Sequence, residues 1–172
     1  MKAFIYILLF TGLSIASSAQ SNSVIGHINM NEILQALPEV DSVRSVMEKE
    51  TKEIETIYEE MQVNYNNLVN DYKNGLAGFT DLQRKTKADE ITDKESRLQE
   101  FEQNANLRLQ RRNMELMQPI YTGINRAVQK IAGNKGIDYV LDLSTGTVVF
   151  TSETSMNITQ AVIREITGDS RE

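Results

Sequence analysis

Few residues in this chain are of the types that carry out chemistry, and their spacing forms no catalytic pattern. The 172 residues include no Cys, no Trp and a single His, His27. Without Cys there is no thiol nucleophile, no disulfide and no Cys-ligated metal site, and one His cannot supply an H-E-x-x-H metal helix. The paired carboxylates Glu59-Glu60 and Asp89-Glu90 are neighbours on an expected helix and point apart, which does not suit acid–base catalysis. We therefore predict no catalytic residue, no metal, no cofactor and no enzymatic activity.

The charge balance indicates which kinds of partner the chain is not expected to bind. The chain carries 24 acidic and 18 basic residues, a formal net charge of −6. A nucleic-acid binder normally shows a basic excess, so no nucleic-acid partner is expected. No G-x-x-x-x-G-K-[ST] loop is present to bind ATP.

The N-terminus is typical of a secretory signal peptide. Lys2 precedes an apolar, uncharged run from Ala3 to Ile15, and small residues at 17–19 follow. This run is shorter than the roughly 20 residues that a membrane-spanning helix needs. We predict that residues 1–19 are cleaved after Ala19 and that the mature protein is exported.

Short apolar segments near the two ends of the mature chain predict a small β-rich body. Residues 23–29, which are β-branched, are predicted to form a strand in which His27 has a structural role. Residues 139–151 are predicted to form a hairpin that turns at Ser144-Thr145-Gly146. Asn29 with Glu32 resembles a capping box, and Pro38 is expected to kink or restart the helix that follows. Asn157 is expected to cap a final helix over residues 158–166.

The long middle of the chain predicts two helices joined by a tip. Apolar residues recur every seven positions in two rows offset by four, which indicates the seam of an antiparallel or coiled-coil-like pair. After residues 74–80, which hold two glycines and no periodicity, the apolar residues recur every eleven positions instead. The first rows comprise Val40, Met47, Ile54, Met61 and Leu68, with Thr51, Tyr58, Tyr65 and Tyr72; the later rows comprise Leu98, Leu109, Ile120 and Ile131, with Ala105, Leu116 and Ala127.

The composition of residues 40–113 argues against a globular packing of these helices. The segment holds 15 acidic and 12 basic residues, and one narrow apolar stripe cannot bury two helices on all sides. We predict an α+β fold with a helical hairpin arm at 40–113, whose tip lies at about 74–80, and a body at 20–39 and 114–172. Because three short strands are marginal alone, the body is expected to oligomerise and so bury the apolar faces of Tyr139, Leu141, Val149 and Phe150.

The order of these segments resembles the Skp/OmpH family of periplasmic chaperones. The carrying residues run over nearly the whole mature chain: Asn29 to Glu39, Pro119-Ile120, Ile124, Ala127-Val128, Lys130 to Ala132, Gly136 to Asp142, and Asn157 to Thr159. The resemblance implies a homotrimer with a small β-barrel body completed by trimerisation, and three helical arms around a cavity. It implies an ATP-independent periplasmic holdase for unfolded outer-membrane β-barrel proteins.

Tyr and Met suit weak, sequence-tolerant contacts, since Tyr is amphipathic and Met is flexible. The usual meaning of such a heptad stripe is the seam between the two helices, and the residues beside it, Ile57, Val63, Val69 and Phe79, are then the better contacts with a client. The residues predicted for client binding are Ile57, Tyr58, Met61, Val63, Tyr65, Val69, Tyr72, Phe79 and Leu82. The residues predicted for the trimerisation body are Val24, Ile25, Ile28, Tyr139, Val140, Leu141, Val148, Val149 and Phe150.

The acidic balance departs from the basic character of well-known family members, so lipopolysaccharide binding is not carried over. Basic residues gather at 73–87 and at Arg108, Arg111 and Arg112, and we expect at most weak contact with an anionic membrane surface. A second reading is a non-catalytic trimeric envelope spacer or adaptor whose arms bind one folded partner.

Overall fold

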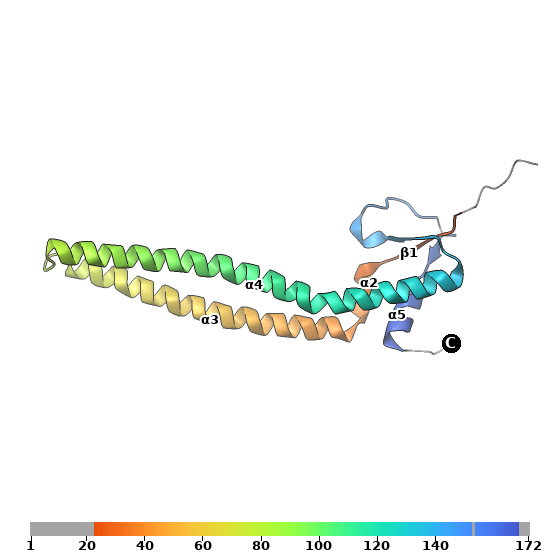
Figure 1. The fold of residues 1–172 in the computed structure, drawn as a ribbon, viewed down its shortest axis with the longest axis horizontal. Helices are drawn as coiled ribbons and strands as arrows, with labels where there is room; N and C mark the ends of the chain where they lie inside the picture. Colours follow the sequence, from red (N-terminus) through yellow and green to blue (C-terminus); the bar gives the residue numbers. More distant parts are fainter. Residues whose placement is uncertain (1–22, 153, 169–172) are drawn as a thin grey trace, which may run out of the picture.

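The structure is a computed structural model, which describes residues 23–152 and 154–168. A small body lies at one end, and two long helices project from it side by side (Figure 1). The predicted signal peptide at residues 1–19 lies outside the described residues. Among the described residues, no helix has both the length and the apolar composition that crossing a bilayer requires.

The arm consists of α3 (Pro38–Gly75) and the distal part of α4 (Asp81–Lys135), whose final turns belong to the body. At 1.5 Å per residue these helices are about 57 and 82 Å long. None of the 38 residues of α3 is buried, and Leu98 is the only buried residue in the distal part of α4. The arm is therefore an extended pair of helices with one thin seam, as the charge count predicts.

The ends of these helices follow from local sequence. Pro38 stands in the first turn of α3, where its missing N–H costs no hydrogen bond, and α2 (Met30–Ala36) ends just before it. Asn29 caps α2 by accepting hydrogen bonds from the backbone N–H groups of Asn31 and Glu32. α4 ends at Gly136, which adopts a positive φ of 64°.

The core of the body is made mainly by helices. Ile33 of α2, Ile124 of α4 and Val162 of α5 (Thr159–Thr167) are fully buried together with Ile158. Leu37, Ile28, Ala127 and Ile137 complete this cluster. The body is thus more helical than the predicted β-rich body.

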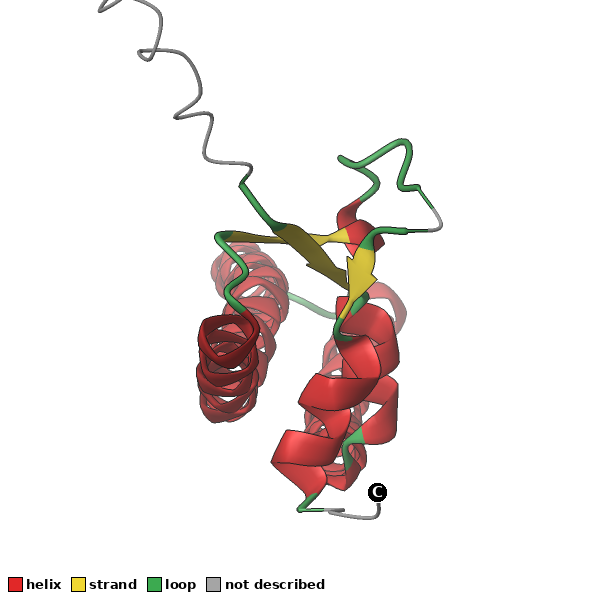
Figure 2. Ribbon diagram, turned by 90° about the vertical axis from the view of Figure 1, so that its right-hand side faces the viewer, coloured by secondary structure: helices red, strands yellow, loops and turns green. Residues whose placement is uncertain are grey.

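Three short parallel strands lie on this helical layer. β1 (Ile25–Ile28) is central, with β2 (Tyr139–Asp142) on one side and β3 (Met156–Asn157) on the other. Ile25 lies beside Tyr139 and His27 beside Leu141. In the view of Figure 2 the helices lie below the sheet, and no helix of the described chain covers its upper side. The single chain forms an open sheet and no closed barrel over its described residues.

The predicted hairpin at 139–151 is wrong. The chain leaves the sheet after Asp142 and makes a 3-10 turn, η2 (Leu143–Thr145), and residues 147–152 form no strand. The Asp142 carboxylate accepts hydrogen bonds from the backbone N–H groups of Ser144 and Met30, at 2.9 and 3.1 Å, which closes the turn and ties it to α2. Gly146 adopts a positive φ of 71°, but it ends the 3-10 turn instead of joining two paired strands.

Candidate binding surfaces

Most of the Tyr and Met residues predicted to bind a client lie in the seam between the two arm helices. Tyr58 stacks on Phe101 of α4, with ring centroids 6.4 Å apart, and Met61 and Tyr65 are half-buried. Across the same seam, Arg112 donates to the Glu50 carboxylate at 2.9 Å. These side chains face the partner helix, so they hold the arm together and offer only their edges to another molecule.

Other predicted client-binding residues stand free of the seam. Ile57 and Val63 on α3 are 46% and 56% exposed, and Leu82 near the tip is 75% exposed. Val69 is half-buried. The structure therefore divides the predicted set into seam residues and three well-exposed apolar side chains.

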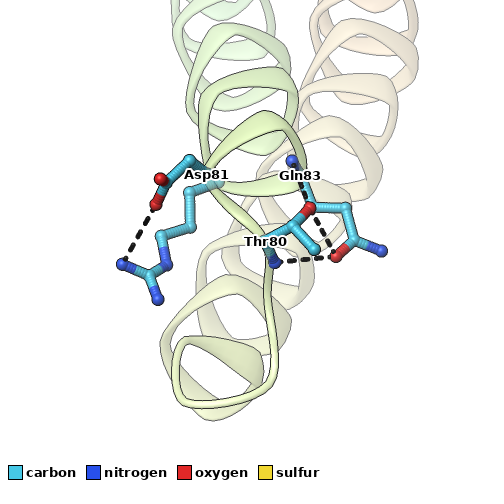
Figure 3. A network of polar contacts seen from close by, with 4 residues as sticks. Thr80, Asp81 and Gln83 are labelled. Atoms are coloured by element: carbon cyan, nitrogen blue, oxygen red, sulfur yellow. Dashed lines mark hydrogen bonds and ion pairs between the residues drawn. The ribbon is translucent and has the colours of Figure 1, made fainter.

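The tip is a tight turn organised by aromatic stacking and a cap. Phe79 stacks on Tyr72, with centroids 6.3 Å apart, so both predicted contact residues are half-buried. Thr80 and Gln83 form a reciprocal capping box at the start of α4, and Asp81 pairs with the next basic residue, Arg84 (Figure 3). The tip is thereby set up by its own sequence, independently of the body.

The basic residues at the tip are largely neutralised by acidic neighbours. Lys85 contacts Asp89 at 2.6 Å, and Lys87 contacts Glu90 at 2.8 Å. Such exposed pairs at i,i+3 and i,i+4 contribute little to stability, but they lower the local field that an anionic surface would meet. The arrangement is that of a solvated helix face of mixed charge.

The outer face of the sheet is a second exposed apolar surface. Since residues paired in register share a face, Ile25, Tyr139 and Leu141 all point away from the helical core, and all three are exposed. His27 lies on this face but is buried, and its Nδ1 lies 3.1 Å from the hydroxyl of Ser155. His27 is structural, as expected. Val24, which precedes the strand, is also exposed.

The segment after the 3-10 turn extends this surface. Val149 and Phe150 are 96% and 81% exposed, values that are unusual for a β-branched and an aromatic side chain. Val148 is half-buried. By contrast, Ile28 is buried in the core of its own chain, and Val140 is half-buried and packs against that core.

One exposed apolar set was missed by the sequence analysis. Leu107, Met114 and Tyr121 on α4 are all exposed. They recur every seven residues but lie off the rows that were assigned to the seam. A search for a second periodic row on the same helix would have found them.

A shallow apolar groove of about 400 Å³ lies where the arm joins the body. Its walls come from the first turns of α3, the middle of α4 and the end of α5, and it is open beside Gly123. Over the described residues, no group of three or more His, Cys, Asp or Glu side chains is placed to hold a metal ion.

The chain is similar in sequence to known proteins. The family model described as "Outer membrane protein (OmpH-like)" matches residues 24–166. The chain is 26% identical over 158 residues to the chaperone protein Skp of Photorhabdus luminescens, covering 90% of this chain and 92% of that one. It is 27% identical over 157 residues to the chaperone protein Skp of Escherichia coli K12, covering 90% and 93%.

A solved structure has the same fold. The crystal structure of an OmpH-like protein from Caulobacter crescentus superposes with a TM-score of 0.69 over 89% of each chain, at 11% sequence identity. At that identity the likeness concerns the fold alone.

Proposed function

Because the chain belongs to the OmpH-like family and its relatives are named Skp chaperones, we propose that it is a periplasmic holdase that binds unfolded outer-membrane β-barrel proteins. The family is one of non-catalytic chaperones, and the chain is not an enzyme. The observation that carries the proposal is the arm: α3 has no buried residue, Leu98 is the one buried residue in the distal part of α4, and several apolar side chains on the two helices are exposed. Such a surface can hold an unfolded chain by many weak contacts without a shaped pocket.

The contacts proposed for the client are the exposed side chains beside the seam. Ile57, Val63 and Leu82 would supply most of the apolar area, and the edges of Tyr58, Met61, Tyr65, Val69, Tyr72 and Phe79 would add to it. Because these residues are spread along the arm, each contact is weak and the sum tolerates many client sequences. We propose at most weak contact between the tip and an anionic membrane, since its basic residues are paired.

We further propose that three copies assemble through the outer face of the sheet. Exposed Ile25, Tyr139, Leu141, Val149 and Phe150 form more apolar surface than a body this small would leave in water. β2 and β3 each have one edge without a partner strand in the described chain, and residues 147–152 of another copy have the β-branched composition to pair there. Assembly would place three arms around one cavity.

The export that this function needs is supported by sequence alone. Residues 1–19 have the pattern of a cleaved signal peptide, and a periplasmic chaperone must cross the inner membrane. Mass spectrometry of the protein recovered from a Gram-negative periplasm is expected to find a chain that begins at Gln20. A cytoplasmic, uncleaved protein would contradict the proposed location.

Suppression of aggregation tests the holdase proposal. An eight-stranded outer-membrane β-barrel protein is unfolded in urea and diluted into buffer, and light scattering is followed with and without the mature chain. We expect scattering to be suppressed at an equimolar ratio of trimer to client, without ATP. Scattering that is unchanged by the chain, alongside a folded control protein of equal mass, would refute the proposal and favour a spacer or adaptor.

A further inference from the structure

The side of α4 that faces away from α3 carries a row of exposed apolar residues near the body. Leu107, Met114 and Tyr121 are 58%, 65% and 40% exposed. Seven residues are close to two helical turns, so the three side chains form one line about 21 Å long. Seam residues such as Ala105 and Arg112 differ from Leu107 and Met114 by two positions, or about 200° around the helix, which puts the row opposite the seam. We call Leu107, Met114 and Tyr121 the α4 track.

The surroundings of the α4 track differ in charge from the rest of the arm. From residue 103 to the end of α4 there are six basic residues and one acidic residue, whereas α3 holds nine acidic and four basic residues. Arg108, Arg111 and Arg126 lie along one flank of the track, and within the described chain they form no ion pair. An acidic polypeptide is therefore repelled less at the α4 track than along α3.

The pattern of the track selects the kind of partner. A helix packing in a coiled coil would need a second apolar row three or four residues on. Those positions hold Gln110, Arg111, Gln118 and Asn125, and the two apolar ones are not free: Met117 is half-buried and Ile124 lies in the core of the body. A helix from a second copy of this chain is therefore a poor match.

An extended chain fits better. Gln103, Gln110 and Gln118 border the track, and an amide side chain both donates and accepts hydrogen bonds. Amides of this kind can satisfy backbone N–H and C=O groups that an unfolded chain leaves unpaired. Leu, Met and Tyr in the row accept apolar side chains of different shapes.

We propose that the α4 track is a binding site for extended polypeptide segments that combine apolar and acidic residues. This inference rests on the proposed holdase function and adds to it a location, since none of the client contacts predicted from sequence lies on this part of α4. It also adds a charge preference: acidic segments of the client bind near the body, on the arginine flank, and not along the acidic helix α3.

The apolar part is tested with the variant Leu107→Gln/Met114→Gln/Tyr121→Gln in the full mature chain. Gln is a good helix former and the three sites are exposed, so the fold is expected to remain intact. Binding of a fluorescently labelled, urea-unfolded outer-membrane barrel protein should weaken about tenfold or more. A comparison variant with the same chemistry on α3, Val46→Gln/Ile57→Gln/Val63→Gln, separates the contribution of the track from that of α3.

The charge part is tested with Arg108→Gln/Arg111→Gln against the charge-matched Lys49→Gln/Lys52→Gln on α3. We expect the first pair to lose more affinity than the second for an acidic client segment, and to show a smaller dependence on salt. A photo-crosslinking residue at position 114 should capture the client.

The outcomes distinguish the two proposals. If the unmodified chain binds no unfolded protein, the holdase proposal and the track fail together. If it binds and the triple variant on the track binds equally well, the track is refuted while the holdase proposal stands. If the triple variant changes the mass of the assembly in sedimentation, the row is a contact between copies and the inference is overturned.

Discussion

At the scale of single residues, two side chains hold neighbouring elements of the structure together. The carboxylate of Asp142 joins the end of β2 to the start of α2 and to the 3-10 turn. Phe79 closes the tip by stacking on Tyr72. Each is a local arrangement with a measurable consequence.

Asp142 should make stability depend on pH. Burial raises the pKa of this carboxyl, but the hydrogen bonds from the Ser144 and Met30 backbone and from the Ser144 hydroxyl outweigh it, so the pKa lies below its ordinary value. A lowered pKa in the folded state means that the stabilisation is present at neutral pH and is lost as the pH falls below about 4. Asp142→Asn should lower the free energy of unfolding at pH 7 by about 1–2 kcal/mol. Urea unfolding at pH 7 and pH 3 checks this; a difference between variant and parent that stays the same at both pH values would contradict it.

The structure of the tip should be sensitive to substitution of Gly75 and insensitive to substitution of Gly78. A Cβ on Gly75 would lie 2.3 Å from the Phe79 ring, so Gly75→Ala must displace that ring from Tyr72. The same change at Gly78 meets its nearest atom at an ordinary 3.7 Å. We expect the near-ultraviolet circular dichroism of the aromatic residues to fall in Gly75→Ala and to change little in Gly78→Ala. Equal spectra for the two variants would show that Phe79 is not held as described.

At the scale of the elements, the seam determines whether the arm is a stable hairpin. Leu98 is its only buried residue beyond the part of α4 that belongs to the body. The other apolar residues along the seam are half-buried, so their packing cannot make up for the loss of Leu98. The other notable feature of α4 is Pro119, which lies inside the helix where the arm meets the body.

Leu98→Ala should loosen the arm without affecting the body. Loss of a buried leucine costs about 2–4 kcal/mol, through the lost burial of its methyl and methylene groups and the cavity that remains. Leu107→Ala, on the exposed side of the same helix, should cost less than about 0.5 kcal/mol. Amide hydrogen exchange checks both: faster exchange in α3 and the distal α4 of Leu98→Ala, with the body unchanged, is the expected result. Uniformly faster exchange over the whole chain would mean that arm and body unfold together.

Pro119 should determine the direction of the arm. Proline lacks the N–H that would bond the carbonyl of residue 115, and its ring crowds that carbonyl, so the helix bends. Figure 1 shows α4 changing direction between arm and body. Pro119→Ala should lengthen the distance between spin labels at Gln99→Cys and Lys135→Cys toward the roughly 54 Å of a straight helix. The chain has no native Cys, so the labels are specific; labelled chains are diluted into unlabelled ones, and an unchanged distance would place the cause of the bend elsewhere.

The helices and the positions of β1 and β2 could be predicted from sequence, whereas the pairing of the strands could not. Helix signals are local: the seven-residue rows, the Asn29 and Thr80 caps and the glycines of the tip all act within a few residues, and the seam lies where these rows predict. Strand pairing depends on distant partners. Residues 147–151 have the composition of a strand, yet they pair with no strand of the described chain, and the predicted hairpin does not form.

The candidate site was predicted only in part for a related reason. A periodic apolar row does not say which side of it another helix will cover. Tyr58 and Met61 belong to the seam, while Ile57 and Val63 beside them are free. The sequence analysis did not identify Leu107, Met114 and Tyr121, because the eleven-residue rows mark only the face of α4 that packs against other helices.

At the scale of the whole molecule, one chain has a poorly covered sheet at one end and an almost coreless arm at the other. Exposed apolar residues such as Tyr139, Val149 and Phe150 are typical of a protein–protein interface. The exposed apolar residues of the arm are spread out, which suits a flexible, unfolded partner. The proposed trimer, joined through the sheets with a client between its arms, would cover both surfaces. Neither surface requires ATP, a metal or a cofactor.

The mass of the client complex tests this account most directly. The mature chain is mixed with an unfolded outer-membrane barrel protein as the urea is diluted away, and native mass spectrometry is recorded. We predict a complex of three copies of the chain with one client molecule. A monomeric chain with no client bound would contradict the account.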